Sequence, residues 1–310
     1  MRILFMGTPE FAVPCFEALI DAGHEVCAVV TQPDKPAGRG HKLTPPPVKQ
    51  KAIQREIQVF QPQTLKDNAF LGELKELNPE MIVVVAYGKI LPEYILNYPK
   101  YGCINIHASL LPKYRGAGPI QWAVINGEEK TGITSMMMEK GLDTGDMLIK
   151  AETEIREYET SDELHDRLMV MGAKVLLDTV SGIENGTISP EKQDDSLSCY
   201  APIITKDMAK IDWNKNSTEV LNLIHGMNSW PVAHTVYNGE MLKIYRAVKG
   251  ELGRTGKCGE IIKVDNSGIE VVCGNSESII IKEVQFFGSK KMDVCSYING
   301  HSVNTGVILG

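Results

Sequence analysis

The sequence predicts a doubly wound α/β domain with a mostly parallel sheet, followed by a small antiparallel β-barrel domain. In the first 150 residues, short β-branched runs alternate with helical patterns. Residues 82–86 (IVVVA) are apolar at every position, as expected of a central strand that helices cover on both faces. Beyond about residue 210 short strands broken by glycine take over, and an oligonucleotide-binding type of barrel is one candidate for them.

The individual elements follow from periodicity. The expected strands of the first part are residues 2–6, 26–31, 81–86 and 102–107, and its expected helices are 13–22, 47–55, 69–77 and 161–186. The second part has an expected helix at 218–227, followed by strands at 233–237, 242–247, 259–264, 269–272 and 278–284. A polar stretch between about 190 and 210 separates the parts, so we expect domains at 1–189 and 207–310 with a linker at 190–206.

Composition narrows the class of protein without giving a function. The chain has 310 residues, 43% of them hydrophobic, and seven cysteines without a C-x-x-C pair, which fits reduced thiols better than disulfides or a zinc site. The start M-R-I-L-F-M-G-T is too short an apolar run for a signal peptide or a membrane span. We therefore expect a cytoplasmic protein with no metal and no membrane segment. A monomer is the expected state, although the sequence does not give the oligomeric state.

Ligands of doubly wound sheets bind beyond the carboxyl ends of the strands. Gly7-Thr8-Pro9 follows the first strand, but no G-x-G-x-x-G pattern lies there, so a dinucleotide cofactor is not supported. Asn105 and His107 alternate with isoleucines at the end of a strand and therefore project from one face. Asp143 lies between glycines in a later loop, G-L-D-T-G-D.

Each of these side chains has a structural explanation when taken alone. Asn105 and His107 could be a buried pair satisfied by backbone groups, and Asp143 could simply form a turn. Brought to one crevice, however, an asparagine, a histidine and an aspartate can carry out acyl transfer. Asn105 would donate to an oxyanion, His107 would exchange protons near neutral pH, and Asp143 would orient the imidazole.

The segments N-I-H-A-S-L-L-P-K-Y-R-G-A-G-P-I and G-L-D-T-G-D resemble the formyltransferase family that uses 10-formyltetrahydrofolate. The similarity runs nearly end to end. The opening F-M-G-T-P-E-F, the loop T-Q-P-D-K-P-A-G-R-G and the late K-I-D-W and S-W-P segments are similar to the branch of this family that acts on charged tRNA. The resemblance implies a Rossmann-like catalytic domain, the catalytic set Asn105, His107 and Asp143, and no covalent enzyme intermediate.

The resemblance also implies two substrates. For 10-formyltetrahydrofolate as the formyl donor it implies an apolar slot at the S-L-L-P turn and after the strand at 81–86, with Ser109, Leu110, Leu111, Pro112, Tyr87, Gly88 and Ile90. Core packing is the alternative for the neighbouring Val85 and Ala86. Cys103 invites a nucleophilic interpretation, but its strand is apolar and most buried cysteines are inert.

The expected acceptor is the free amino group of methionyl-initiator tRNA. Although the net charge is −7, residues 33–51 carry five basic residues against Asp34 alone. By resemblance this loop enters the acceptor stem, with Arg39 as the recognition residue. The further basic residues expected at the tRNA are Lys35, Lys42, Lys206, Lys210 and Lys243. Taken singly, each charge could also simply be solvated.

Rival functions stay open at this point. One is a formyltransferase acting on a small amine, such as glycinamide ribonucleotide or an amino sugar, or a hydrolase of formyl-folate. These would need the same three catalytic residues but neither the basic loop nor the second domain. Another is a non-catalytic RNA-binding protein, which formyl transfer itself would exclude.

Overall fold

The computed structural model describes residues 1–37 and 42–310 and divides the chain into two compact units. The first comprises residues 1–116, 132–153 and 165–200, and the second comprises residues 117–131, 154–164 and 201–310.

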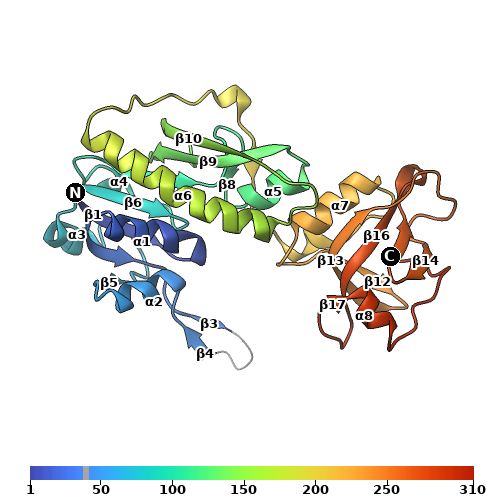
Figure 1. Ribbon diagram of the computed structural model, residues 1–310. Helices are drawn as coiled ribbons and strands as arrows, with labels where there is room; N and C mark the ends of the chain where they lie inside the picture. Colours follow the sequence, from blue (N-terminus) through green and yellow to red (C-terminus); the bar gives the residue numbers. More distant parts are fainter. Residues whose placement is uncertain (38–41) are drawn as a thin grey trace. The chain divides into compact units, whose positions relative to one another are not determined.

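A seven-stranded sheet forms the centre of the first unit (Figure 1). Its order is β10-β9-β7-β6-β1-β2-β5. The strands are β1 (Arg2–Gly7), β2 (Glu25–Val30), β5 (Val59–Phe60), β6 (Met81–Val85), β7 (Cys103–His107), β9 (Lys130–Met137) and β10 (Met147–Glu154). β1 pairs in parallel with β2 and β6, and β6 with β7, whereas β9 runs antiparallel to β7.

The strand order reverses between β1 and β6, because the chain winds outward from β1 in both directions. At this switch point the loops after three strands meet. The Thr8 hydroxyl and the Gln32 side-chain amide both donate to the carbonyl of Tyr87, at 3.0 and 3.1 Å. A ligand crevice is expected at such a place in a doubly wound sheet.

Helices cover the sheet because their apolar stripes need a partner surface. They are α1 (Val13–Asp21), α2 (Pro47–Gln54), α3 (Leu71–Leu77), α4 (Glu93–Leu96) and α6 (Ser161–Glu184). In α6 the predicted stripe is buried, with Leu168 and Leu176 fully inaccessible. A Cβ on Gly172 would lie 3.3 Å from Ile106 of β7 and 3.6 Å from the Cys15 sulfur of α1, so α6 packs closely on both.

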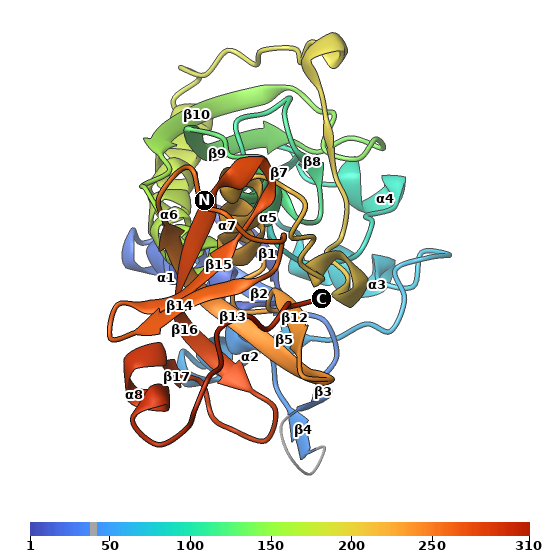
Figure 2. The same ribbon diagram turned by 90° about the vertical axis from the view of Figure 1, so that its right-hand side faces the viewer.

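The second unit is built on an antiparallel sheet, seen face on in Figure 2. Its order is β12-β13-β16-β15-β14, and β17 pairs with β16. The strands are β12 (His234–Tyr237), β13 (Glu240–Lys249), β14 (Ile261–Asp265), β15 (Gly268–Val272), β16 (Ser278–Phe286) and β17 (Met292–Asp293). All five longer strands coincide with predicted ones, since alternation and glycine turns mark them in the sequence.

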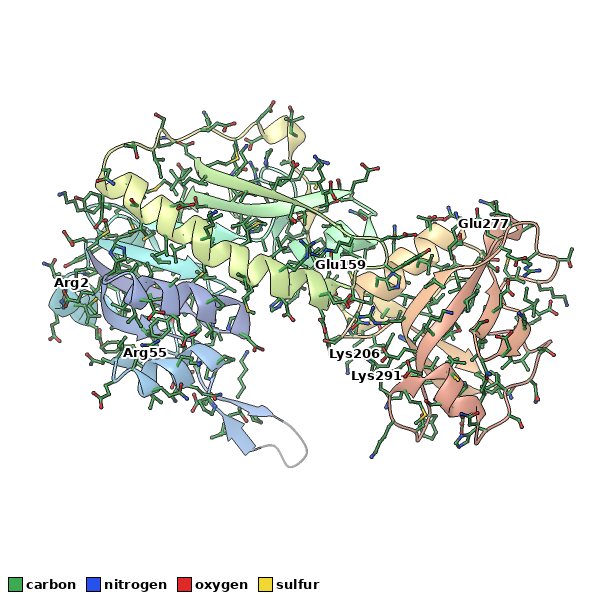
Figure 3. The ribbon with its side chains drawn as sticks, viewed as in Figure 1. Arg2, Arg55, Glu159, Lys206, Glu277 and Lys291 are labelled. Carbon is green, nitrogen blue, oxygen red and sulfur yellow. The ribbon has the colours of Figure 1, made fainter. Side chains whose placement is uncertain are left out.

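Three helices accompany this sheet: α5 (Pro119–Ile125), α7 (Ser217–Gly226) and α8 (Val294–Ile298). α7 begins with a capping box between Asn216 and Glu219. Glu277, labelled in Figure 3, accepts hydrogen bonds from the backbone and hydroxyl of Ser217 at 2.8 and 2.6 Å. These hydrogen bonds lower the pKa of the Glu277 carboxyl.

The remaining strands and 3-10 helices are short. They are β3 (Lys35–Ala37), β4 (Lys42–Thr44), β8 (Arg115–Gly116), β11 (Tyr200–Ala201), η1 (Glu10–Ala12), η2 (Asp195–Leu197), η3 (Lys206–Ala209) and η4 (Gly274–Ser276). The predicted fold class, a doubly wound, mostly parallel sheet followed by an antiparallel β domain, is confirmed. Among the described helices none is both long and apolar enough to cross a bilayer.

Candidate active site

Strand β7 presents two polar side chains on one face. Asn105 lies opposite Met136 of β9, and His107 lies opposite Thr134. The intervening Ile104 and Ile106 are buried at 0% and 3% exposure. The alternation read from the sequence therefore places Asn105 and His107 on the same face, at the carboxyl end of a strand next to the switch point.

The imidazole of His107 is buried and held at one nitrogen. Its side chain is 6% exposed, and Nε2 lies 2.8 Å from the carbonyl oxygen of Tyr114. A carbonyl can only accept, so Nε2 must carry the proton of this hydrogen bond. Nδ1 is therefore the nitrogen that can take up or release a proton, and it lies 3.7 Å from Oδ2 of Asp143.

Asp143 reaches this position from a tight loop. Its backbone is in the left-handed region, at φ 52°, which aspartate tolerates better than most residues. The backbone N–H of Gly116 donates to Oδ2 at 2.9 Å and so fixes the carboxylate. A Cβ on Gly145 would lie 1.9 Å from the carbonyl oxygen of Met137, so the loop can pass this close to β9 only with a glycine at position 145.

Asn105 differs from both in having its amide free. The side chain is half-buried, and no other part of residues 1–37 and 42–310 makes a hydrogen bond with it. Partly buried amides are normally paired, so an unpaired one at a strand end is available to a ligand. Asn105 thus lies on the face of β7 that carries His107, and His107 lies beside Asp143, while a shared catalytic role of the three stays a prediction.

Sequence reasoning missed one member of this neighbourhood, Gln193. It lies in the stretch interpreted as a linker, yet it is only 6% exposed. Its side-chain amide donates to the backbone carbonyls of Asp143 and Gly145, at 2.8 and 2.7 Å. A single glutamine in a polar run gives no signal in the sequence, because its partners are 50 and 48 residues away.

The residues expected at the folate fall into two groups. Three have buried side chains: Tyr87 (1% exposed), Ser109 (0%) and Leu111 (2%). The Ser109 hydroxyl donates to the carbonyl of Lys113 at 2.7 Å and so braces its own turn. Burial raises the pKa of Tyr87 to about 12, with a smaller contribution from Tyr94.

The second group is accessible. Leu110 and Pro112 are half-buried, Gly88 is exposed, and Ile90 is 86% exposed. An isoleucine so exposed beside the switch point is open to an apolar ligand. The folate contacts of both groups stay a prediction.

The basic residues lie in both units. Lys35 is exposed at the start of β3, and Lys42 begins β4, while Arg39 lies outside the described residues. Burial, and next the charge of Lys35, lower the pKa of Lys89 in the loop after β6.

In the second unit Lys206, labelled in Figure 3, and Lys210 are exposed, and Lys243 is half-buried on β13. These positions are compatible with contacts to phosphate, which stay a prediction.

Cys103 does not behave as a nucleophile. It is 1% exposed, and burial raises the pKa of its thiol to about 12, so the reactive thiolate is not formed at neutral pH. No group of three or more possible metal ligands occurs among the described residues.

Comparison with known proteins places the chain in a family. The model of the formyl transferase domain matches residues 1–180, and the model of the formyl transferase C-terminal domain matches residues 203–302. The chain therefore belongs to the formyl transferase family.

Two curated relatives are about half identical to the chain. The methionyl-tRNA formyltransferase of Alkaliphilus oremlandii is 54% identical over 310 residues, and that of Caldanaerobacter subterraneus is 53% identical over 310 residues. Both matches span 100% of this chain and 100% of the relative.

More distant solved structures share the fold. One is an N-formyltransferase from Helicobacter canadensis in complex with folinic acid and dTDP-3-aminofucose, with a TM-score of 0.70 and 20% identity over 93% of this chain and 100% of that chain. Another is HypX from Aquifex aeolicus in complex with tetrahydrofolic acid, with a TM-score of 0.62 and 17% identity over 97% of this chain and 47% of that chain.

Proposed function

We propose that the chain transfers the formyl group of 10-formyltetrahydrofolate to the free amino group of methionyl-initiator tRNA. One observation carries this proposal. Asn105, whose amide has no partner among the described residues, shares a face of β7 with His107, and Nδ1 of His107 lies 3.7 Å from the Asp143 carboxylate. The chain that carries these residues is about half identical to methionyl-tRNA formyltransferases over its whole length.

The reaction is an exchange of one C–N bond for another. The neutral amine of the methionyl group attacks the formyl carbon, and the carbonyl oxygen becomes an oxyanion on a tetrahedral carbon. Collapse of this intermediate breaks the bond to the folate N10. The amine loses one proton and N10 gains one, so no net acid or base is consumed.

Each of the three side chains has a task in this sequence. The amide of Asn105, which no protein group occupies within the described part of the chain, is the donor for the oxyanion. Nδ1 of His107 is the nitrogen free to carry the proton from the amine toward N10. Asp143, 3.7 Å away, orients the imidazole and balances the charge it acquires.

The two substrates would occupy different parts of the chain. We assign the folate to the S-L-L-P turn at 109–112 and the loop at 86–91, which follow neighbouring strands of the sheet. The tRNA would meet the basic loop around Arg39 and the exposed lysines 206 and 210. On this proposal residues 1–189 form the catalytic domain and residues 207–310 a tRNA-binding domain, acting as a monomer, with no metal required.

The small-amine alternative has weaker support. An amino-sugar complex occurs among the solved structures, but that protein is 20% identical to this chain, so the likeness concerns the fold alone. The relatives at 54% and 53% identity match both domains over their full length.

The deciding experiment compares acceptors. Purified protein is given 10-formyltetrahydrofolate with methionyl-initiator tRNA, and in parallel with glycinamide ribonucleotide. We expect formylation of the tRNA only. Equal transfer to the small amine would overturn the assigned acceptor, and release of formate without an acceptor would favour the hydrolase.

Two substitutions test the catalytic assignment. His107→Ala should lower kcat by about 100-fold or more, because a positioned acid–base group contributes about 100 to 10,000-fold. Asp143→Asn should also lower kcat, because the variant no longer balances the charge that the imidazole acquires. Asparagine is chosen at 143 because it tolerates the left-handed backbone found there. Thermal melts must show that both variants remain folded, and a folded variant with full activity would refute the assigned role.

A further inference from the structure

The side chain of Gln193 joins two segments of the candidate site from inside the protein. Its Nε2 donates to the carbonyl of Asp143 at 2.8 Å and to the carbonyl of Gly145 at 2.7 Å. Its Oε1 accepts from Nε and Nη2 of Arg115, at 3.0 and 2.8 Å. Every polar group of this buried amide therefore has a partner.

The chemistry of the partners fixes which way the amide faces. A guanidinium only donates, so the amide oxygen must face Arg115, and backbone carbonyls only accept, so the NH₂ must face residues 143 and 145. An aliphatic side chain can do neither, a carboxylate lacks the two donors, and asparagine is one methylene too short to span the same gap. The site is built for glutamine.

This amide acts on the backbone that carries Asp143. The carboxylate of Asp143 is held from one side by the N–H of Gly116, and the backbone of the same residue is held from the other side by Gln193. The neighbouring residue Arg115 supplies the guanidinium that orients the glutamine. Together these contacts keep a left-handed residue and its carboxylate 3.7 Å from His107.

Such restraint matters for rate more than for binding. Displacement of a catalytic group by about 1 Å can cost about 100-fold in rate even when the substituted residue lies outside the reacting atoms. Removal of hydrogen bonds that orient active groups typically costs 10 to 100-fold.

We propose that Gln193 is a positioning residue for the formyl transfer, which locks the loop at 143–145 so that the Asp143 carboxylate faces the imidazole of His107. The inference rests on the proposed function and deepens it. It also assigns a role to a residue in the stretch that the sequence presents as a linker.

The test is the nearly isosteric substitution Gln193→Glu. It keeps an oxygen for Arg115 but removes both donors to the loop. We expect kcat to fall about 10 to 100-fold. KM for the formyl-folate and for the charged tRNA should stay within about twofold, since the glutamine is only 6% exposed. A fall in kcat/KM that came only from KM would overturn the proposal.

The matched control is Asp195→Ala. Asp195 also accepts from Arg115, at 2.7 Å, but its side chain is 83% exposed. An exposed ion pair contributes little, so we expect activity within about twofold of the original chain. If both variants lost activity equally, the integrity of Arg115 rather than the loop contact would be responsible, and the proposal would fall.

A double-mutant cycle with Asp143→Asn separates positioning from a general structural defect. If Gln193 acts through the carboxylate, Gln193→Glu should lower the residual activity of Asp143→Asn by less than about twofold. Fully additive losses would refute the proposal. Gln193→Asn enters the same cycle, so that poor folding of one variant does not remove the test.

Amide hydrogen exchange supplies a readout that needs no activity. Exchange at residues 143–146 should accelerate in Gln193→Glu, whereas exchange in β1 and β6 should not change. If the original chain formylated no tRNA but the exchange result held, the proposed function would fail while the restraint on the loop stood. If the exchange rates of residues 143–146 did not change, this result alone would refute the positioning role of Gln193.

Discussion

Asn105 offers the sharpest test of the site, because its amide is bound to nothing in the described part of the chain. Substitution by alanine removes the amide and leaves no buried partner unsatisfied. An asparagine with a structural role behaves differently, since its substitution leaves its hydrogen-bond partners unsatisfied. The substitution Asn105→Ala therefore separates a catalytic role from a structural one.

The magnitudes follow from this geometry. Since no hydrogen bond is lost and the side chain is half-buried, the free energy of unfolding should change by less than about 1 kcal/mol. Loss of one donor to an oxyanion costs about 100 to 1000-fold in kcat, equivalent to about 2.7–4 kcal/mol of transition-state stabilisation. The expected variant is thus stable and nearly inactive.

Two measurements on the same preparations decide the matter. Urea denaturation gives the stability, and transfer of a labelled formyl group from formyl-folate to charged tRNA gives kcat. Asn97→Ala, at an exposed position, serves as the control and should change neither. Ser109→Ala, which deletes the hydroxyl that braces the turn, should instead destabilise by about 1–3 kcal/mol. An Asn105→Ala protein with kcat above a third of the original would refute the oxyanion role.

Three further outcomes are expected. Burial lowers the pKa of His225 from 6.5 to about 4 in the folded protein, so the imidazole binds a proton more tightly in the unfolded chain than in the folded one. The free energy of unfolding should be highest above about pH 6.5 and fall by about 1.4 kcal/mol per pH unit between there and pH 4. Urea titrations should find this slope reduced in His225→Gln, whose amide can still donate to Ala247. Cys103→Ala should keep kcat within about twofold, because the thiol is not the nucleophile, and a larger loss in a folded protein would contradict this. Arg39→Ala should raise KM for tRNA about tenfold, with kcat and the KM for formyl-folate nearly unchanged and a weaker salt dependence; an effect on kcat alone would remove Arg39 from recognition.

The fold was predictable because its signals are local. A fully apolar run at 82–86, alternation in the second domain and a leucine stripe in α6 each depend on neighbours a few residues away. The structure places β6, the five strands of the second unit and α6 within a few residues of the expected positions. The family of the chain was predictable for a similar reason. The segments N-I-H-A-S-L-L-P and G-L-D-T-G-D are each an unbroken run of residues, so that they can be recognised without the structure.

The part of the site that depends on contacts between distant residues could not be read in this way. The sequence shows Asn105 and His107 on one face of a strand, but not that Nε2 of His107 is committed to Tyr114, which leaves Nδ1 for proton exchange. It also gives no sign that Ser109 turns its hydroxyl inward.

Local patterns in the sequence were enough to predict the class of fold, the family and the polar residues at the end of β7. The contacts that hold these residues in place became visible in the folded chain alone. Gln193 is 50 residues from Asp143 along the chain and stands in a polar stretch like any linker. Hydrogen bonds between residues so far apart in the sequence depend on the packing of the whole chain, because no local propensity or spacing predicts them.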